Sequence, residues 1–174
     1  AQGIFESFAP TSGRVLVLAD WTDVANGKLL VFSLPCNGRS IPLFAKAVAK
    51  KAGEGAMIRA ENEGLEILQR VCRSRPDVTL VADRGFGNQR WIPKAQALGF
   101  HFVQRLSGVF WADTEHYIGK LEEMNLRNGK RVRDWGKGTL GEDERIHARL
   151  VTAFDPKAKE HWDHDDIEII KLHI

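Results

Sequence analysis

The sequence has little cysteine and no long apolar run, and each shortage excludes a class of protein. Its two cysteines, Cys36 and Cys72, form no CxxC pair, which argues against a thiolate zinc site and against a disulfide framework. No apolar run approaches the ~20 residues that cross a bilayer, and the amino terminus lacks the pattern of a signal peptide. We therefore expect a cytoplasmic protein with reduced thiols and no membrane partner.

Net charge is also small, but its distribution along the chain is uneven. A net charge of +2 is too mild to indicate nucleic-acid binding by itself. However, no Asp or Glu occurs from Val24 to Gly53 or from Arg84 to Ala112, and each of these blocks follows a carboxylate, Asp23 or Asp83. Two interpretations stay open: solvated Lys and Arg side chains, or a basic surface around an acidic centre that suits a polyanion. The cations of the two blocks are Lys28, Arg39, Lys46, Lys50, Lys51, Arg84, Arg90, Lys94 and Arg105.

The first part of the chain predicts an antiparallel meander. Residues 1–13 have the polar composition of a lead-in segment. The run 14–19 is apolar on both faces, which is typical of a central strand, and Asn26-Gly27 is a hairpin signal before a second strand at 28–34. A third strand at 41–48 carries Pro42 near its start, so we expect it at the sheet edge.

The middle of the chain predicts a βαβ unit. Apolar residues recur at helical spacing from Ala60 to Arg73. A buried strand at 78–82 then ends in Asp83, and Gly85 and Gly87 turn the chain. Asn88 can cap a helix that runs to about Leu98, Gly99 can end it, and residues 100–106 form the next strand. The expected order is β-β-β-α-β-α-β, an α/β fold with a mixed sheet.

Topology predicts that two carboxylates meet. Asp20 ends the first strand and Asp83 ends the fourth. A strand that returns through a helical crossover is parallel and often adjacent, which would place both ends about 5 Å apart. Carboxylates that close repel unless a cation lies between them, and Mg²⁺ or Mn²⁺ suits oxygen ligands and phosphodiester chemistry. The alternative is that Asp20 starts a turn and Asp83 caps the glycine loop.

The remainder predicts a β-rich appendage. A strand fits residues 146–152, whereas Gly136 and Gly138 indicate turns and residues 117–125 fit a short helix or loop. The resulting division is a core at 14–108, the start of a β-rich insertion at 109–156 and an irregular acidic tail at 157–174. Within that tail, His161 and His164 have a spacing that binds zinc or nickel weakly.

Two segments of the sequence resemble a known family. Leu18-Ala-Asp20-Trp-Thr-Asp23, followed by Ile41-Pro-Leu-Phe44, is similar to the first catalytic segment of DDE transposases from bacterial insertion sequences. Leu80-Val-Ala-Asp83-Arg-Gly-Phe-Gly87, followed by Phe102-Val-Gln-Arg105-Leu, resembles the second. The resemblance covers about residues 14–108 and implies an RNase H-like fold with strand order 3-2-1-4-5 and a β-rich insertion after strand five.

The resemblance also implies a site and its partners. Asp20 and Asp83 correspond to the first two metal-binding catalytic acids, with Mg²⁺ or Mn²⁺ as cofactor and no small-molecule cofactor. The implied partners are transposon-end and target DNA, at the nucleoid, and a second copy or a full-length transposase. Phosphate contacts are expected from Arg84 and Arg105 first, and from Arg90 and Lys94. Trp21 and Trp91 are candidates for stacking on DNA.

One expected element is missing from the sequence. The family's third acid is a Glu on a helix, within a Tyr-x2-Arg-x3-Glu pattern that this sequence lacks. Tyr117 to Glu123 imitates it poorly and lies too early. The chain thus looks like the amino-terminal part of a carboxy-terminally truncated transposase catalytic domain. Two alternatives stay open: a non-catalytic, truncated transposase that regulates by binding DNA or its full-length partner, and an RNase H-like metal-dependent nuclease.

Overall fold

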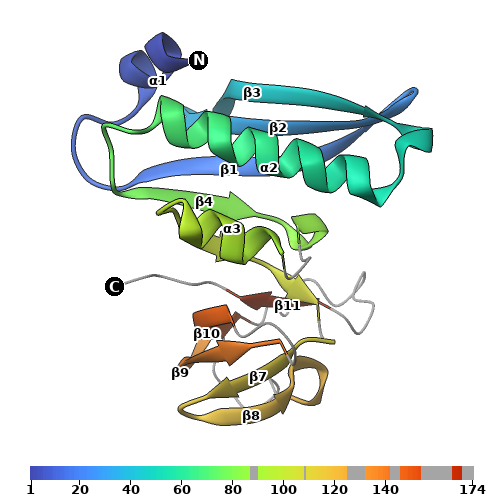
Figure 1. Cartoon of the computed structure of the whole chain (residues 1–174). Coiled ribbons are helices and arrows are strands. Elements are labelled where there is room, and N and C mark those ends of the chain that lie inside the picture. Colours follow the sequence, from blue (N-terminus) through green and yellow to red (C-terminus); the bar gives the residue numbers. More distant parts are fainter. Residues whose placement is uncertain (87–89, 108, 125–131, 142–145, 154–165, 170–174) are drawn as a thin grey trace.

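The computed structural model in Figure 1 describes residues 1–86, 90–107, 109–124, 132–141, 146–153 and 166–169. It contains a five-stranded sheet with helices and a second sheet of six strands. The first sheet has the strand order β3-β2-β1-β4-β5, so the predicted α/β architecture and strand order are confirmed. Its strands are β1 (Val15–Val24), β2 (Gly27–Cys36), β3 (Arg39–Ala49), β4 (Val78–Ala82) and β5 (His101–Gln104).

The five-stranded sheet is mixed, and β1 lies at its centre. β1, β2 and β3 form the expected antiparallel meander. β1 is parallel to β4, and β4 is parallel to β5. As expected from Pro42, β3 occupies an edge of the sheet. β4 lies between β1 and β5 and is almost continuously buried, as is typical of an inner strand with parallel neighbours.

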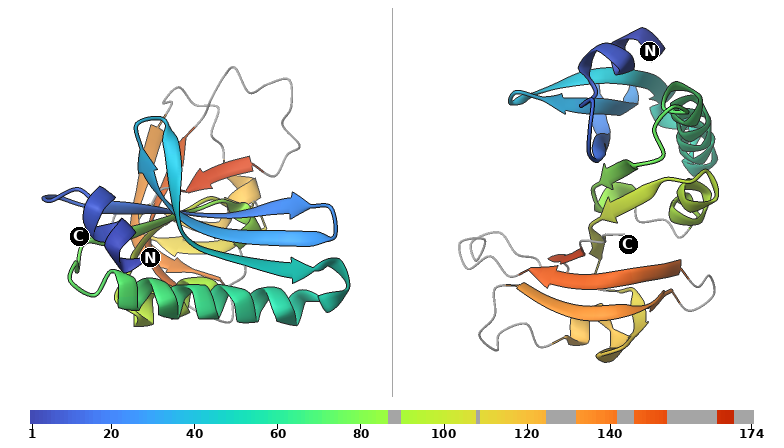
Figure 2. Two further views of the ribbon diagram at one scale, coloured as in Figure 1. Left: turned by 90° about the horizontal axis from the view of Figure 1, so that it is seen from above. Right: turned by 90° about the vertical axis from the view of Figure 1, so that its left-hand side faces the viewer.

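Two helices, α2 (Glu54–Val71) and α3 (Trp91–Ala97), cover one face of this sheet (Figure 2). α2 buries Leu65 and Leu68 against the core. It begins at Glu54 rather than at the predicted Ala60. The sequence did not reveal residues 54–59 as helical, because they are exposed or half-buried and show no apolar periodicity. α3 lies within the predicted helix and is followed by Gly99 with a φ of 85°. Asn88, the expected cap, lies outside the described residues.

The lead-in segment, for which the sequence indicated no helix or strand, contains regular structure. It contains the helix α1 (Gln2–Phe8), which contacts β2 and β3. Phe5 is 2% exposed and is the only buried residue of α1. One apolar side chain gives no periodicity, so the sequence pattern could not reveal this helix.

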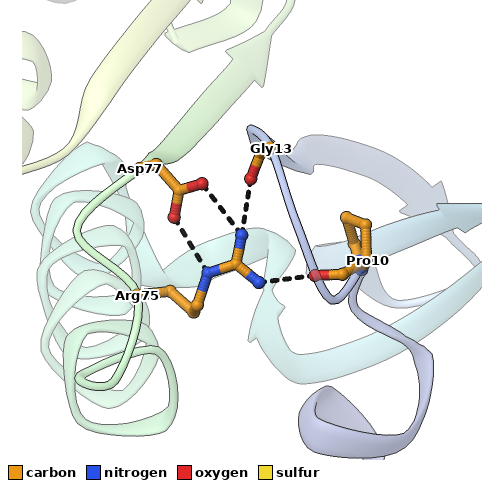
Figure 3. Close-up of polar contacts among 4 residues, drawn as sticks. All are labelled: Pro10, Gly13, Arg75 and Asp77. Carbon is orange, nitrogen blue, oxygen red and sulfur yellow. Dashed lines mark hydrogen bonds and ion pairs between the residues drawn. The ribbon is translucent and has the colours of Figure 1, made fainter.

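Arg75 fixes the connection between α1 and β1 to the connection between α2 and β4 (Figure 3). Its guanidinium donates to both carboxylate oxygens of Asp77, at 3.0 and 2.8 Å, and to the carbonyl oxygens of Pro10 and Gly13. The backbone N–H of Val15 donates to the carbonyl of Asp77 at 3.2 Å. These contacts hold the amino-terminal ends of β1 and β4 together.

The second sheet has the order β6-β11-β10-β9-β7-β8. It lies beyond β5, below the first sheet in the right view of Figure 2. The strand predicted at 146–152 is confirmed, and most described residues between 109 and 153 lie in strands. Regular structure also occurs within the segment interpreted as an irregular tail, since β11 pairs with β10 and β6. The strands are β6 (Leu106–Ser107), β7 (Trp111–Thr114), β8 (Tyr117–Lys120), β9 (Val132–Leu140), β10 (Ile146–Ala153) and β11 (Asp166–Ile169).

Two predictions in the appendage are wrong. Tyr117–Lys120 is the strand β8, followed by the short 3₁₀ helix η3 (Leu121–Glu123). Gly136 and Gly138 lie inside β9 and make no turn. A Cβ at Gly138 would lie 2.0 Å from the carbonyl oxygen of Asp113, and one at Gly136 would lie 2.6 Å from a carboxylate oxygen of Glu115. These glycines let neighbouring residues approach the backbone of β9 closely, which is a known role of glycine within strands besides forming turns.

Candidate functional site

Asp20 and Asp83 occupy neighbouring positions at the carboxyl end of the β1–β4 pair. The parallel register ends at Ala19 opposite Ala82. The next residues are Asp20 and Asp83, so their backbones lie about one strand spacing, ~4.8 Å, apart. The prediction that β1 and β4 are adjacent and parallel is confirmed. Both aspartates are exposed.

The sequence predicts that the first strand ends at Asp20, but β1 continues beyond this residue. β1 continues to Val24, because residues 20–24 still pair with β2 after the β4 ladder has stopped. Asp20 therefore lies at the boundary between a region of β1 with two neighbours and a region with one. The sequence signal placed this boundary correctly but mistook it for the end of the strand, since polar residues follow in the exposed arm.

The side chain of Asp20 lies on the sheet face opposite to α2. The indole N–H of Trp21 donates to Glu61 of α2 at 3.0 Å, so Trp21 is on the helical side. Side chains alternate along a strand, which places Asp20 and Thr22 on the other side. The Thr22 hydroxyl donates to a carboxylate oxygen of Asp20 at 3.0 Å, as the shared face requires.

Arg105 extends this row of residues onto β5. The β4–β5 register ends at Ala82 opposite Gln104, and the N–H of Arg105 donates to the carbonyl of Ala82 at 3.2 Å. Asp20 of β1, Asp83 directly after β4 and Arg105 directly after β5 thus occupy neighbouring positions in one row. A predicted phosphate-binding residue lies beside the two predicted metal-binding acids.

The other predicted phosphate contacts are placed differently. Arg90 is exposed immediately before α3. Lys94 lies on α3, on the helical side of the sheet, and donates to Glu66 of α2 at 2.9 Å. This hydrogen bond, with the positive charge of Lys94, lowers the pKa of Glu66 below its ordinary value. Arg84 begins the 3₁₀ helix η2 (Arg84–Phe86), and the prediction for its side chain lies outside what the structure describes.

Acids from other parts of the chain neutralise some cations of the two acid-free blocks. Lys28 lies 4.0 Å from Asp23, and Lys46 lies 3.0 Å from Glu63. The basic surface inferred from the sequence is accordingly interrupted on β2, β3 and α2. A hollow at the tip of the β1–β2 hairpin has a lining of mixed charge that includes neither Asp20 nor Asp83; it contains Asp23, Lys28, Lys50, Glu54 and Met57.

The two tryptophans proposed to stack on DNA belong to the interior. Trp91 is 1% exposed, which makes that interpretation wrong for Trp91, and Trp21 is half-buried against the core. Sequence reasoning missed Glu61, a carboxylate that is only 3% exposed and accepts the Trp21 hydrogen bond. Its place in an amphipathic helix gave no sign of burial, because charged residues usually face solvent.

Within the described part of the chain, no group of three or more His, Cys, Asp or Glu side chains is arranged to hold a metal ion. Glu122 and Glu123 lie in η3, which follows β8 of the second sheet. His161 and His164 lie outside the described residues. No helix among the described residues is long and apolar enough to cross a membrane.

Comparison with known proteins gives no matching family model and no matching curated protein. The chemistry of the site must therefore be argued from its own residues. Two exposed carboxylates one strand spacing apart, with an arginine on the next strand, can hold a hard cation and a phosphate together.

Proposed function

We propose that this chain carries the metal-binding half of an RNase H-like, DNA-processing catalytic domain of the DDE transposase type. The observation that supports this most is the register of β1 and β4. In a sheet of order 3-2-1-4-5, it puts Asp20 beside Asp83 at the carboxyl end of the parallel strands, where open α/β sheets gather their ligands. The proposed reaction is cleavage of a DNA strand at an insertion-sequence end, followed by joining of its 3′-hydroxyl to target DNA.

The donor set fits a hard divalent cation. Asp20 and Asp83 offer carboxylate oxygens from neighbouring strands, and both side chains are exposed, so water can complete the coordination. Such a cation, Mg²⁺ or Mn²⁺, would activate a water or hydroxyl and stabilise a leaving oxygen when bound. Thr22 orients Asp20 through its hydroxyl, and Arg105 is the proposed contact for a DNA phosphate.

The first test is Mn²⁺ binding by calorimetry on the parent chain and on Asp20→Asn and Asp83→Asn. Removing one of two charged ligands should weaken binding by about tenfold or more, ~1.4 kcal/mol. Asp23→Asn is the matched control, since it removes an equal charge from the same strand. Its side chain lies an odd number of residues from Asp20, on the other face. Failure of the parent to bind, or equal binding by both variants, would overturn the proposed metal site.

DNA assays then separate the three candidate functions. Nicking of supercoiled DNA in Mg²⁺ or Mn²⁺ distinguishes an enzyme from a chain that regulates transposition by binding alone. Joining of a 3′-hydroxyl end to a second DNA distinguishes a transposase from an RNase H-like nuclease, because a nuclease only cuts. Loss of either activity in Asp83→Asn assigns it to this site.

A further inference from the structure

The Asp20–Asp83 pair is connected, on the helical side of the sheet, to a cluster of one buried carboxylate and three aromatic rings, of which two are buried and one is half-buried. Trp21 follows Asp20 directly, and its indole N–H donates to Glu61 at 3.0 Å. The Trp21 ring stacks on Phe86, with centroids 6.5 Å apart and planes inclined by 29°. Phe86 packs in turn against Trp91 at 5.1 Å. Phe86 and Trp91 are at most 1% exposed.

The cluster also contacts the segment that carries Asp83. Phe86 belongs to η2, the turn that follows Asp83, and its backbone N–H donates to the Asp83 carbonyl at 3.0 Å. The Trp21–Phe86 contact therefore joins the backbone around Asp20 to the turn around Asp83. The β1–β4 ladder ends at Ala19 and Ala82, so this contact joins the two segments just beyond the ladder.

Burial of Glu61 has an energetic consequence. A carboxylate removed from water loses hydration that only hydrogen bonds can replace. The Trp21 indole is one of its donors, so Glu61 and Trp21 hold each other in one arrangement. An apolar residue at position 61 would avoid the desolvation but would leave the indole N–H free to turn, and with it the strand segment that bears Asp20.

We propose that Glu61, Trp21 and Phe86 are positioning residues that fix the separation of Asp20 and Asp83. This inference rests on the proposed function for its metal, but not for its geometry. Trp21 acts by keeping its side chain on the helical face, which directs Asp20 to the opposite face. Phe86 acts by holding the turn after Asp83 against the Trp21 ring. Neither aromatic ring touches the bound cation in this proposal.

The experiment measures Mn²⁺ affinity in Trp21→Phe, Glu61→Leu and Glu61→Gln at a temperature where circular dichroism shows each variant folded. Loss of a group that orients a metal ligand typically costs ~10–100-fold in affinity. We expect a loss of about tenfold or more for Trp21→Phe and Glu61→Leu. Glu61→Gln keeps an acceptor oxygen for the indole and should bind within about threefold of the parent, a difference well below that range.

A matched control is present in the second sheet. The indole N–H of Trp135 donates to the Thr152 hydroxyl at 2.9 Å, in a buried pair. Trp135→Phe therefore removes the same kind of hydrogen bond, away from the carboxylates, and should leave Mn²⁺ affinity unchanged. Equal affinities for the parent and Trp21→Phe would overturn the proposal, and equal losses in Trp21→Phe and Trp135→Phe would show a merely structural role.

A second measurement needs no metal. Asp20→Cys and Asp83→Cys are combined in a Cys36→Ser, Cys72→Ala background, and the disulfide is equilibrated against glutathione. A disulfide requires Cα atoms about 4.4–6.8 Å apart, so its stability reports how well the separation is fixed. Adding Trp21→Phe should shift this equilibrium about tenfold towards the thiols, ~1.4 kcal/mol, and no shift would overturn the proposal. If the parent chain binds no Mn²⁺ but this shift occurs, the proposed function fails and the positioning role stands.

Discussion

At the scale of single residues, Gly64 sets how closely α2 approaches the sheet. A Cβ at this position would lie 2.4 Å from one ring carbon of Phe32 and 3.0 Å from one of Phe44. Both rings come from the meander, and they pack against each other with centroids 5.9 Å apart. Glycine has a low helix propensity, so Gly64 weakens the helix locally. A larger residue would collide with the aromatic rings that pack against α2.

We therefore expect Gly64→Ala to destabilise the fold, although alanine favours helices. Overpacking a core costs about 1–3 kcal/mol, which exceeds the ~1 kcal/mol that alanine gains over glycine in a helix. Gly55→Ala is the control in the same helix, because its Cβ would meet only Arg59, at 3.6 Å. Urea unfolding measures both variants. A Gly64→Ala chain as stable as Gly55→Ala would show that the rings move aside without cost.

At the scale of elements, the contacts of Arg75 connect two chain segments far apart in sequence. The hydrogen bond from Arg75 is the main cause that lowers the pKa of Asp77 below its ordinary value, and it raises the pKa of Arg75. Because the Asp77 pKa is lower in the folded chain than in the unfolded chain, this contact stabilises the fold at pH values above the unfolded pKa. The contribution declines as the pH falls through the folded pKa.

The prediction is that Asp77→Asn lowers the free energy of unfolding at neutral pH and that this difference shrinks below about pH 4, the ordinary Asp pKa. Asp113→Asn, a change of the same kind at an exposed site on β7, reports pH effects unrelated to Arg75. Unfolding by urea across pH 3 to 7, approximately the range that spans this titration, gives the comparison. A difference that is constant with pH would contradict an ionic role for Asp77.

Sequence patterns predicted the elements of the first sheet better than their ends. The adjacency of Asp20 and Asp83 followed from apolar runs and from the crossover rule, whereas the full strand order was implied by the family resemblance. The continuation of β1 to Val24 did not follow from such patterns, because pairing with β2 there involves polar, exposed residues that carry no burial signal. Gly138 was predicted to lie in a turn but lies in β9. A glycine needed for close packing and a glycine needed for a turn cannot be told apart in the sequence. Glu61 and its indole partner lie 40 residues apart, beyond any local pattern.

At the scale of the whole molecule, the fold pairs several cations of the two acid-free sequence blocks with acids that lie elsewhere in the chain. Lys28, Lys46 and Lys94 each find an acid from another segment. Arg105 follows β5, in the row of Asp20 and Asp83. DNA binding through such a surface should still depend on salt, because bound phosphates release counterions.

We expect the logarithm of the DNA-binding constant to fall linearly with the logarithm of the salt concentration. Arg105→Gln and Arg90→Gln should each reduce the slope by about 0.9, the value for one phosphate contact on duplex DNA. Lys94→Gln is the comparison for Arg90→Gln, and its effect should be smaller because Lys94 is already paired with Glu66. Fluorescence anisotropy at several salt concentrations measures the slopes. A flat slope for the parent would rule out the basic surface.

The early end of β4 also has a dynamic consequence. From Asp20 to Val24, β1 loses its neighbour on one side and keeps only the ladder to β2. Backbone amides with fewer protecting contacts open more often than those in the interior of a sheet. Residues 20–24 thus form a two-stranded arm with β2 that extends from the sheet to the β1–β2 turn. We expect the fluctuations of this arm to grow towards the β1–β2 turn, because Trp21 anchors its base next to Asp20 through Glu61 and Phe86.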